Sequence, residues 1–124
     1  MEALLKSAWL ALAFIHLPPS LVAFRPALAS TLYGVPVGGA SELLLAHRGV
    51  LFVAVAVLAA YAAFDPQARR VGSLVVAISI LGFLTLYVRA GAPGGPLRTI
   101  ALVDLAALLP LGLAAYAAWR HPAA

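Results

Sequence analysis

The sequence predicts an all-α integral membrane protein: an antiparallel four-helix bundle with a short interfacial helix between its first and second spans. Of its 124 residues, 65% are hydrophobic and only 10% are charged, and the mean hydropathy is +1.06. A soluble domain is about half apolar and a quarter charged. Because one span needs about 20 mostly apolar residues, this length allows four spans and no separate soluble domain. The apolar segments are continuous rather than alternating, which argues against a transmembrane β-barrel.

The first span is expected over residues 4–24. We interpret it as an uncleaved helix and not as a signal peptide, because Pro18, Pro19 and Arg25 separate its apolar run from Ala27–Ala29, which resembles a cleavage site. A proline inside a helix removes a backbone donor. The two prolines should therefore kink or break the second half of this span.

The connection after the first span contains signals for a short helix. Pro26 can open it and Gly34 can close it. We expect this helix to lie at the membrane interface, with Tyr33 in the headgroup layer, where aromatic residues are enriched.

Three further spans follow, each bounded by breaking residues. The second is expected over 42–64, with Ser41 as its N-cap, and Asp65 followed by proline ends it. The third is expected over 71–88 and the fourth over 99–119. Since the connections between these three spans are very short, the helices that they join should be antiparallel neighbours.

Charge indicates the orientation only weakly. Four spans put both termini on one side, whose basic residues are Lys6, Arg69, Arg70 and Arg120. The basic residues of the other side are Arg25, Arg48, Arg89 and Arg98. Because the amino terminus adds a positive charge to the first side, we expect cytoplasmic termini.

The basic residues are scattered over helix ends, so no nucleic acid is expected as a partner. The absence of cysteine excludes disulfides and thiolate metal sites.

Small residues should provide the helix contacts, because lipid offers no hydrophobic drive between helices. The second span offers Ala56, Ala59, Ala60 and Ala63, and the third offers Gly72, Ser73, Ala77 and Gly82. The fourth span offers Ala101, Ala107, Gly112, Ala114 and Ala118.

Ionisable residues gather at the end of the bundle that holds the first and third connections. The candidate polar cluster comprises His16, Tyr33, Glu42, His47, Arg48, Arg89 and Asp104. A charge inside the membrane costs about 2.5–3.5 kcal/mol and normally faces a partner. We expect an ion pair of Arg48 with Asp104; a functional polar pocket and an unpaired, snorkelling arginine are the alternatives. The opposite end should hold nothing comparable, since Asp65, Arg69 and Arg70 are expected in a loop.

Cofactor chemistry has only weak signals. His16 and His47 could ligate a haem axially, although histidines hydrogen-bonded inside a bundle are far commoner. The same histidines with Glu42 and Asp104 have suitable metal-ligand types but no tight spacing. No nucleophile elbow, P-loop or GxGxxG occurs. We therefore expect no metal and no cofactor, and the sequence favours a non-enzymatic role.

Three segments together resemble a known group: LASTLYGVP after the first span, LLLAHRGVLF opening the second, and ALVDLAALL in the fourth. The chain is similar to small bacterial four-helix inner-membrane proteins of the DoxX-like kind. The resemblance implies a multi-pass protein of the bacterial inner membrane, with Tyr33, Gly34, His47, Arg48 and Asp104 as family-type positions. It implies no secure activity, although the DoxX name suggests quinone-linked oxidoreduction in some relatives.

Two function classes follow as expectations. The first is a non-enzymatic protein of the lipid bilayer whose polar pocket binds a small amphiphile, or which supports a membrane complex through a membrane-protein partner or a homo-oligomer. The alternative is a quinone-, haem- or proton-handling component of a membrane redox system. In either class we expect the functional surface in the half that holds the first connection, where the segment from Arg25 to Ser41 could act as a lid and Tyr33 could cover a pocket mouth.

Overall fold

The computed structural model describes residues 1–120, of which 86% are helical and none lies in a strand. The all-α four-helix prediction is therefore confirmed. The elements in chain order are α1 (Glu2–Ser20), η1 (Leu21–Ala23), α2 (Leu28–Tyr33), α3 (Gly39–Phe64), η2 (Pro66–Ala68), α4 (Arg69–Arg89) and α5 (Pro96–Arg120). The helices η1 and η2 are short 3-10 turns that continue α1 and precede α4.

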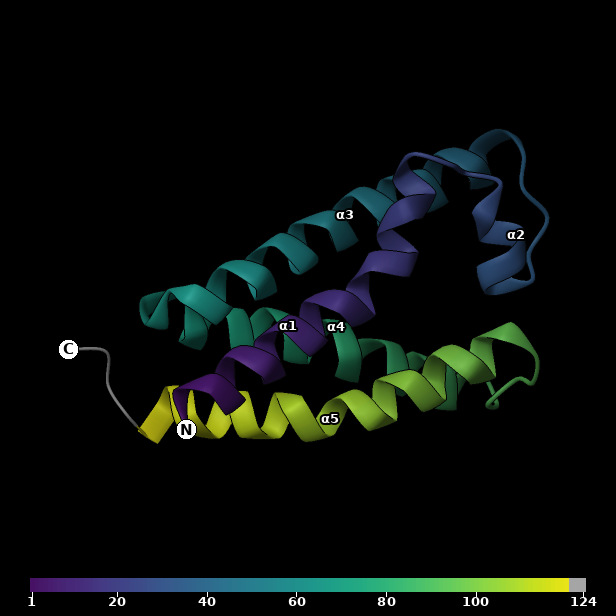
Figure 1. Cartoon of the computed structure of the whole chain (residues 1–124). Helices are drawn as coiled ribbons and strands as arrows, with labels where there is room; N and C mark the ends of the chain where they lie inside the picture. Colours follow the sequence, from purple (N-terminus) through teal and green to yellow (C-terminus); the bar gives the residue numbers. More distant parts are fainter. Residues whose placement is uncertain (121–124) are drawn as a thin grey trace.

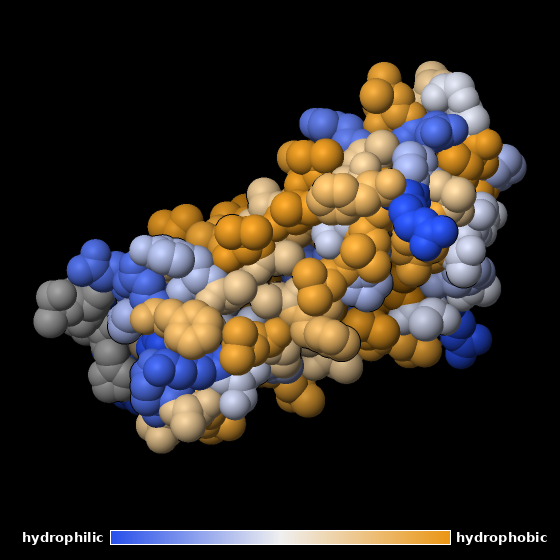
Figure 2. All heavy atoms as spheres, turned by 45° about the horizontal axis from the view of Figure 1, so that its top comes forward, coloured by the Kyte–Doolittle hydropathy of each residue, from blue (hydrophilic) through white to orange (hydrophobic). Residues whose placement is uncertain are grey.

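Four helices are long and apolar enough to cross a membrane: α1 with η1, α3, η2 with α4, and α5. Their outward faces carry large apolar side chains such as Phe14, Ile78 and Leu109, each more than 70% exposed. In Figure 2, hydrophobic residues cover the middle of the molecule and hydrophilic residues gather toward its two ends. This distribution suits a multi-pass protein whose exposed middle is covered by lipid.

The four long helices run alternately up and down, so that the amino terminus and the end of α5 lie at the same end of the bundle (Figure 1). Helix α1 packs against α3 and α5, and α4 packs against the same two helices. The pairs α3–α4 and α4–α5 are neighbours, as their short connections predict. The α1–α3 contact is the most extensive, whereas the α3–α4 contact is sparse.

The core consists mainly of small residues around one large ring, that of Trp9, which is fully buried. Most of the predicted contact residues are buried or packed against the core, as expected. Gly82 and Gly112 are the exceptions, because both are exposed and a Cβ on either would meet open space. The two glycines face outward from the bundle, so their assignment to helix contacts was wrong.

Two boundaries differ from the sequence expectation. Helix α1 continues without a break through Pro18 and Pro19 to Ser20, whose hydroxyl donates to the Leu17 carbonyl at 2.6 Å. Helix α3 begins at Gly39 with Gly38 as its N-cap, so Ser41 lies inside the helix and is not the cap. Its hydroxyl instead donates to the Gly38 carbonyl at 2.8 Å.

The predicted short helix is α2, and Gly34 closes it in the left-handed conformation with φ of 68°. Tyr33 is only 5% exposed, so its ring is packed within the protein and does not face outward as an interfacial aromatic residue would. Tyr33 packs with Val22 and Ala29 in a second apolar cluster that also includes residues at the start of α5. Helix α2 therefore fills the space between the ends of the bundle helices (Figure 1).

Candidate functional site

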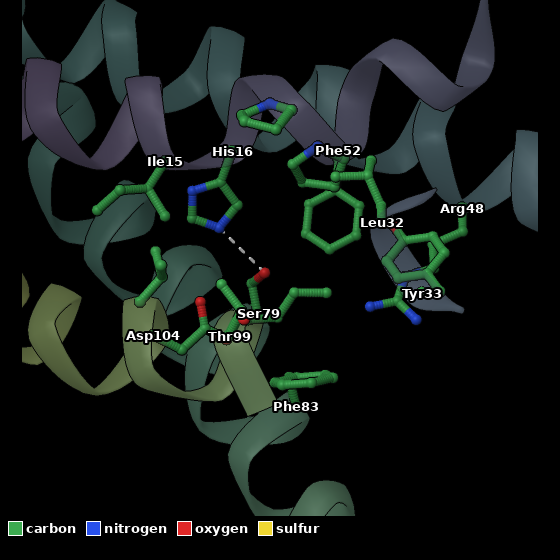
Figure 3. Close-up of a pocket in the computed structure, with 14 residues that line it drawn as sticks. Ile15, His16, Leu32, Tyr33, Arg48, Phe52, Ser79, Phe83, Thr99 and Asp104 are labelled. Atoms are coloured by element: carbon green, nitrogen blue, oxygen red, sulfur yellow. Dashed lines mark hydrogen bonds between the residues drawn. The ribbon is translucent and has the colours of Figure 1, made fainter. Parts of the chain in front are cut away.

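A cavity of about 230 Å³ lies at the end of the bundle that α2 covers. All five α-helices contribute to its wall. We call it the inner cavity (Figure 3), and its polar lining residues are His16, Tyr33, Arg48, Ser79, Thr99 and Asp104.

Four of the seven predicted cluster residues meet in this cavity, namely His16, Tyr33, Arg48 and Asp104. The other three do not line it. His47 and Arg89 are exposed, and Glu42 is half-buried. The predicted cluster is therefore assembled only in part, because the side chains of Glu42, His47 and Arg89 do not face the cavity.

His16 is buried and both of its ring nitrogens have partners. Its Nδ1 lies 2.7 Å from the Leu12 carbonyl oxygen, and since a carbonyl can only accept, Nδ1 carries a proton. Its Nε2 lies 3.2 Å from the Ser79 hydroxyl, a contact that joins α1 to α4. In the neutral ring, Nε2 accepts from that hydroxyl. His16 is therefore fixed in place at the wall of the cavity.

The Arg48 guanidinium is surrounded by three aromatic rings, which we call the aromatic cage. Its Cζ lies 5.0 Å from the ring centroid of Tyr33, 5.3 Å from that of Phe52 and 6.0 Å from that of Phe83. A cation over an aromatic face gains about 0.5–2 kcal/mol, with the larger values in desolvated sites. The cage thus holds a positive charge within the apolar part of the bundle without a carboxylate partner.

The expected Arg48–Asp104 ion pair is absent. Within residues 1–120 the only contact between a basic and an acidic group at 4.0 Å or less is that of Arg69 with Glu2. Figure 3 shows Arg48 and Asp104 on different sides of the cavity, with Phe52 between them in the view. The two residues share a depth and a cavity, but the width of the cavity separates their charges.

We expect the substitutions Arg48→Gln and Asp104→Asn to be close to additive. A pair without direct contact should show a coupling below about 1 kcal/mol, whereas breaking a buried ion pair costs about 3–5 kcal/mol. A double-mutant cycle on equilibrium unfolding in detergent measures the coupling. A strong favourable coupling, with either single variant worse than the double, would mean that the side chains do meet.

The Tyr33 hydroxyl is buried and has no hydrogen-bond partner among the described residues. Burial raises the pKa of this hydroxyl above its ordinary value, and the nearby positive charge of Arg48 offsets part of the effect. The group therefore remains a neutral O–H at physiological pH. A buried donor without a partner costs about 1–3 kcal/mol, so an acceptor delivered to this cavity would be stabilising.

The end of the bundle that holds the termini also contains a buried charged residue. The expectation that this end holds nothing comparable to the polar cluster was therefore wrong. Arg69 begins α4 instead of lying in a loop, and it is only 6% exposed. Its Nε donates to the Ala62 carbonyl at 3.0 Å, and its Nη1 donates to a Glu2 carboxylate oxygen at 3.1 Å. A cation beside the last carbonyls of a helix is favourable, so Arg69 joins the end of α3 to the starts of α1 and α4.

A second arginine closes the same end of the bundle. Arg70 donates to the Ala118 carbonyl at 3.1 Å and lies over the Trp119 ring, 5.3 Å from its centroid. The Trp119 indole N–H donates to the Ser73 hydroxyl at 3.1 Å. These polar groups have partners within the protein, which distinguishes this end from the inner cavity.

The geometry does not bring the two candidate haem ligands together. His16 lines the inner cavity with both nitrogens in contact with protein atoms, whereas His47 is exposed and lies outside it. Among residues 1–120 no group of three or more His, Cys, Asp and Glu side chains could hold a metal ion.

The wall residues that sequence reasoning missed include Phe52, Ser79, Phe83 and Thr99. A signal existed for two of them. Phe52 follows Arg48 by one helical turn, which places the two on one face of α3. Ser79 is an isolated polar residue in the apolar run of α4. Phe83 reaches the cavity only because α4 packs beside α3, which no local pattern predicts.

No protein-family model, no curated protein and no solved structure matches this chain. The argument on function therefore depends on the geometry of the site.

Proposed function

We propose that this chain is a non-enzymatic membrane protein whose inner cavity binds a small amphiphile, with the amphiphile's anionic or carbonyl head beside Arg48 and Tyr33. One observation carries the proposal. The Arg48 guanidinium has no ion-pair partner among the described residues, the Tyr33 hydroxyl has no hydrogen-bond partner, and both line the same cavity.

The composition of the wall favours an amphiphile over a wholly polar ligand. Apolar side chains such as Ile15, Leu32 and Val103 make up most of the lining beside the few polar groups. Ligand sites in general are mostly apolar with a small number of converging polar groups that fix the orientation. An acceptor oxygen on the ligand would satisfy the donors of Arg48 and Tyr33, and its apolar part would contact the rest of the wall.

We further propose that the protein is DoxX-like, resides in the bacterial inner membrane and has cytoplasmic termini. Four apolar spans support the first part, together with the segments that carry the resemblance. The orientation is supported by the positive-inside rule. Because Arg48 lies inside a span, only Arg25, Arg89 and Arg98 remain as basic flanking residues at the cavity end, against four at the other.

A quinone is the second candidate ligand. It corresponds to the alternative function expected from the sequence, that of a component of a membrane redox system. The observation that favours it is the pair of donors, since the Tyr33 hydroxyl and the Arg48 guanidinium could each donate to a quinone carbonyl. A neutral carbonyl gains less from Arg48 than a carboxylate does, because a carboxylate adds the attraction of a full negative charge and can be bound bidentately by the guanidinium.

The test is equilibrium binding of radiolabelled decanoate to the protein in phosphatidylcholine nanodiscs. We expect Arg48→Gln to weaken binding by about tenfold to a hundredfold, because a hydrogen bond to a charged group is worth about 1.5–3 kcal/mol. A short-tailed quinone should compete with decanoate only weakly.

Arg89→Gln is the matched control, because it removes the same charge from an exposed position at the same end of the molecule. It should leave the affinity for decanoate unchanged. Equal losses in the two variants would mean that decanoate responds to surface charge, and full binding by Arg48→Gln would remove the basis of the proposal.

A further inference from the structure

A second hollow adjoins the inner cavity on the side of the bundle where α3 and α4 face each other. It has a volume of about 310 Å³, and we call it the α3–α4 groove. Its apolar wall consists of Leu51, Val55, Ile78, Gly82, Phe83 and Leu86. Leu51, Ile78 and Leu86 are each at least 55% exposed, so the groove opens on the apolar outer surface that lipid covers.

The groove lies between α3 and α4, whose contact is the sparsest among the neighbouring long helices. Gly82 lies in its floor, and a Cβ at this position would meet no atom within 4 Å. A helix pair normally closes such a space with side chains or with close backbone contact through small residues. Here the glycine leaves the space open instead of allowing a helix contact.

Four residues line both hollows: Arg48, Phe52, Ser79 and Phe83. The inner cavity and the groove therefore adjoin at these four side chains. A head group beside Arg48 therefore lies where the two hollows meet, and a chain attached to that head can continue into the groove.

We propose that the occupant is a single-chain carboxylate amphiphile drawn from the surrounding bilayer, with its carboxylate at Arg48 in the inner cavity and its chain in the α3–α4 groove. This inference rests on the proposed function of the inner cavity, and it adds the ligand class and the route of entry.

The volumes require the chain to leave the inner cavity. Sites that enclose a drug-sized ligand measure about 300–1,000 Å³. At about 230 Å³ the inner cavity accommodates a head and the first part of a chain, but not a complete amphiphile. One groove of about 310 Å³ takes one further chain, which favours a single-chain ligand over a two-chain lipid.

The charges of the cavity favour a single negative charge on the head. Arg48 is the one cation among the residues that line the inner cavity, and Asp104 lies on its other side. A carboxylate carries one charge and two acceptor oxygens, which a guanidinium binds bidentately. A phosphate would bring a second negative charge toward Asp104, which repels it.

Entry from the bilayer is favoured because α2 covers the end of the bundle at which the other route would open. Helix α2 packs through Ala29 and Tyr33 against residues that include Leu97 and Ile100 of α5. A Cβ on Gly34 would lie 3.4 Å from the Pro96 ring, so the end of α2 also lies close to α5. Helix α2, which lies in the segment expected to act as a lid, is thus packed over the cavity, whereas the groove opens on the outer surface of the bundle.

The experiment uses palmitate with a diazirine in the middle of its chain, added to the protein in phosphatidylcholine vesicles, illuminated and mapped by peptide mass spectrometry. We expect the labels on Leu51, Ile78 and Leu86. The variant Gly82→Leu fills the groove without changing the inner cavity, and it should lower labelling by about tenfold, equivalent to a tenfold weaker association.

Gly112→Leu is the control, since Gly112 is likewise an exposed helical glycine facing open space, but on α5. Its labelling should equal that of the wild type. Labels on α2 or the Arg25–Ser41 connection, or unchanged labelling of Gly82→Leu, would overturn the groove proposal. If decanoate binding still depended on Arg48 after such a result, the inner cavity would remain the head-group site and only the groove proposal would fail. If decanoate binding did not depend on Arg48, the proposed function itself would fail.

Discussion

Replacing Gly49 with alanine is expected to destabilise the bundle by about 3 kcal/mol, near the upper end of what overpacking costs. Gly49 lies where α3 crosses η1, and a Cβ on it would lie 2.5 Å from the Ala23 backbone nitrogen and 3.1 Å from the Val22 carbonyl carbon. Backbone atoms cannot rotate away as side chains do, so the two segments must separate. Equilibrium unfolding of the purified protein in mild detergent with increasing dodecyl sulfate measures the loss.

Gly112→Ala is the matched control for this prediction. It adds the same methyl group to a helix, but into open space. Because alanine has a better helix propensity than glycine by about 0.8–1.0 kcal/mol, this variant should be as stable as the wild type or slightly more stable. Similar unfolding curves for the Gly49 and Gly112 variants would show that α3 and η1 are not in close contact.

Trp9→Ala is expected to destabilise the protein by about 3 kcal/mol. The ring is fully buried at the centre of the core, and its Cη2 lies 3.0 Å from the position that a Cβ on Gly72 would occupy. Truncation of a buried tryptophan costs about 3–5 kcal/mol in soluble proteins. We expect the lower end, because lipid is as apolar as the core and only packing is lost.

Trp9→Phe separates packing from hydrogen bonding. The Trp9 indole N–H has no partner among the described residues, so phenylalanine loses part of the ring volume but no hydrogen bond. Its cost should stay below about 1.5 kcal/mol, as for other near-conservative core changes. Circular dichroism during unfolding provides the measurement. A phenylalanine variant as unstable as the alanine variant would contradict the account in which a six-membered aromatic ring supplies most of the packing at this position.

The spans could be predicted from the sequence because their signals are local. Apolar length determines where a helix can cross a bilayer, and charged or glycine- and proline-rich breaks end it. All four spanning helices nevertheless start two or three residues before their predicted positions, at Glu2, Gly39, Arg69 and Pro96. The position of Arg69 matters most, because as the first residue of α4 it reaches the carbonyls at the end of α3.

The composition of the site could be predicted only in part. Helical rise gave the shared depth of His16, Arg48 and Asp104, which is why all three meet at the inner cavity. Depth does not determine the distance across a bundle, and so the predicted ion pair does not form. The aromatic cage needs the α3–α4 packing that brings Phe83 beside Arg48, and that packing is not a property of either helix alone.

The local sequence also does not reveal which small residues make helix contacts. Gly49, the glycine at which an added Cβ would come closest to another segment, was not singled out, while Gly82 and Gly112 were assigned to contacts that they do not make. A glycine marks either a close approach or an open space, and the sequence pattern is the same in both cases. Only the neighbouring segment decides between them: η1 for Gly49 and the empty groove for Gly82.

The central claim is that Arg48 binds the head of an amphiphile inside the membrane, and native mass spectrometry of the protein purified from membranes in a mild detergent tests it most directly. We predict a bound mass in the range of a fatty acid on the wild type and on Arg89→Gln, and its absence from Arg48→Gln. An adduct retained in full by Arg48→Gln, or no adduct on any of the three proteins, would contradict the claim.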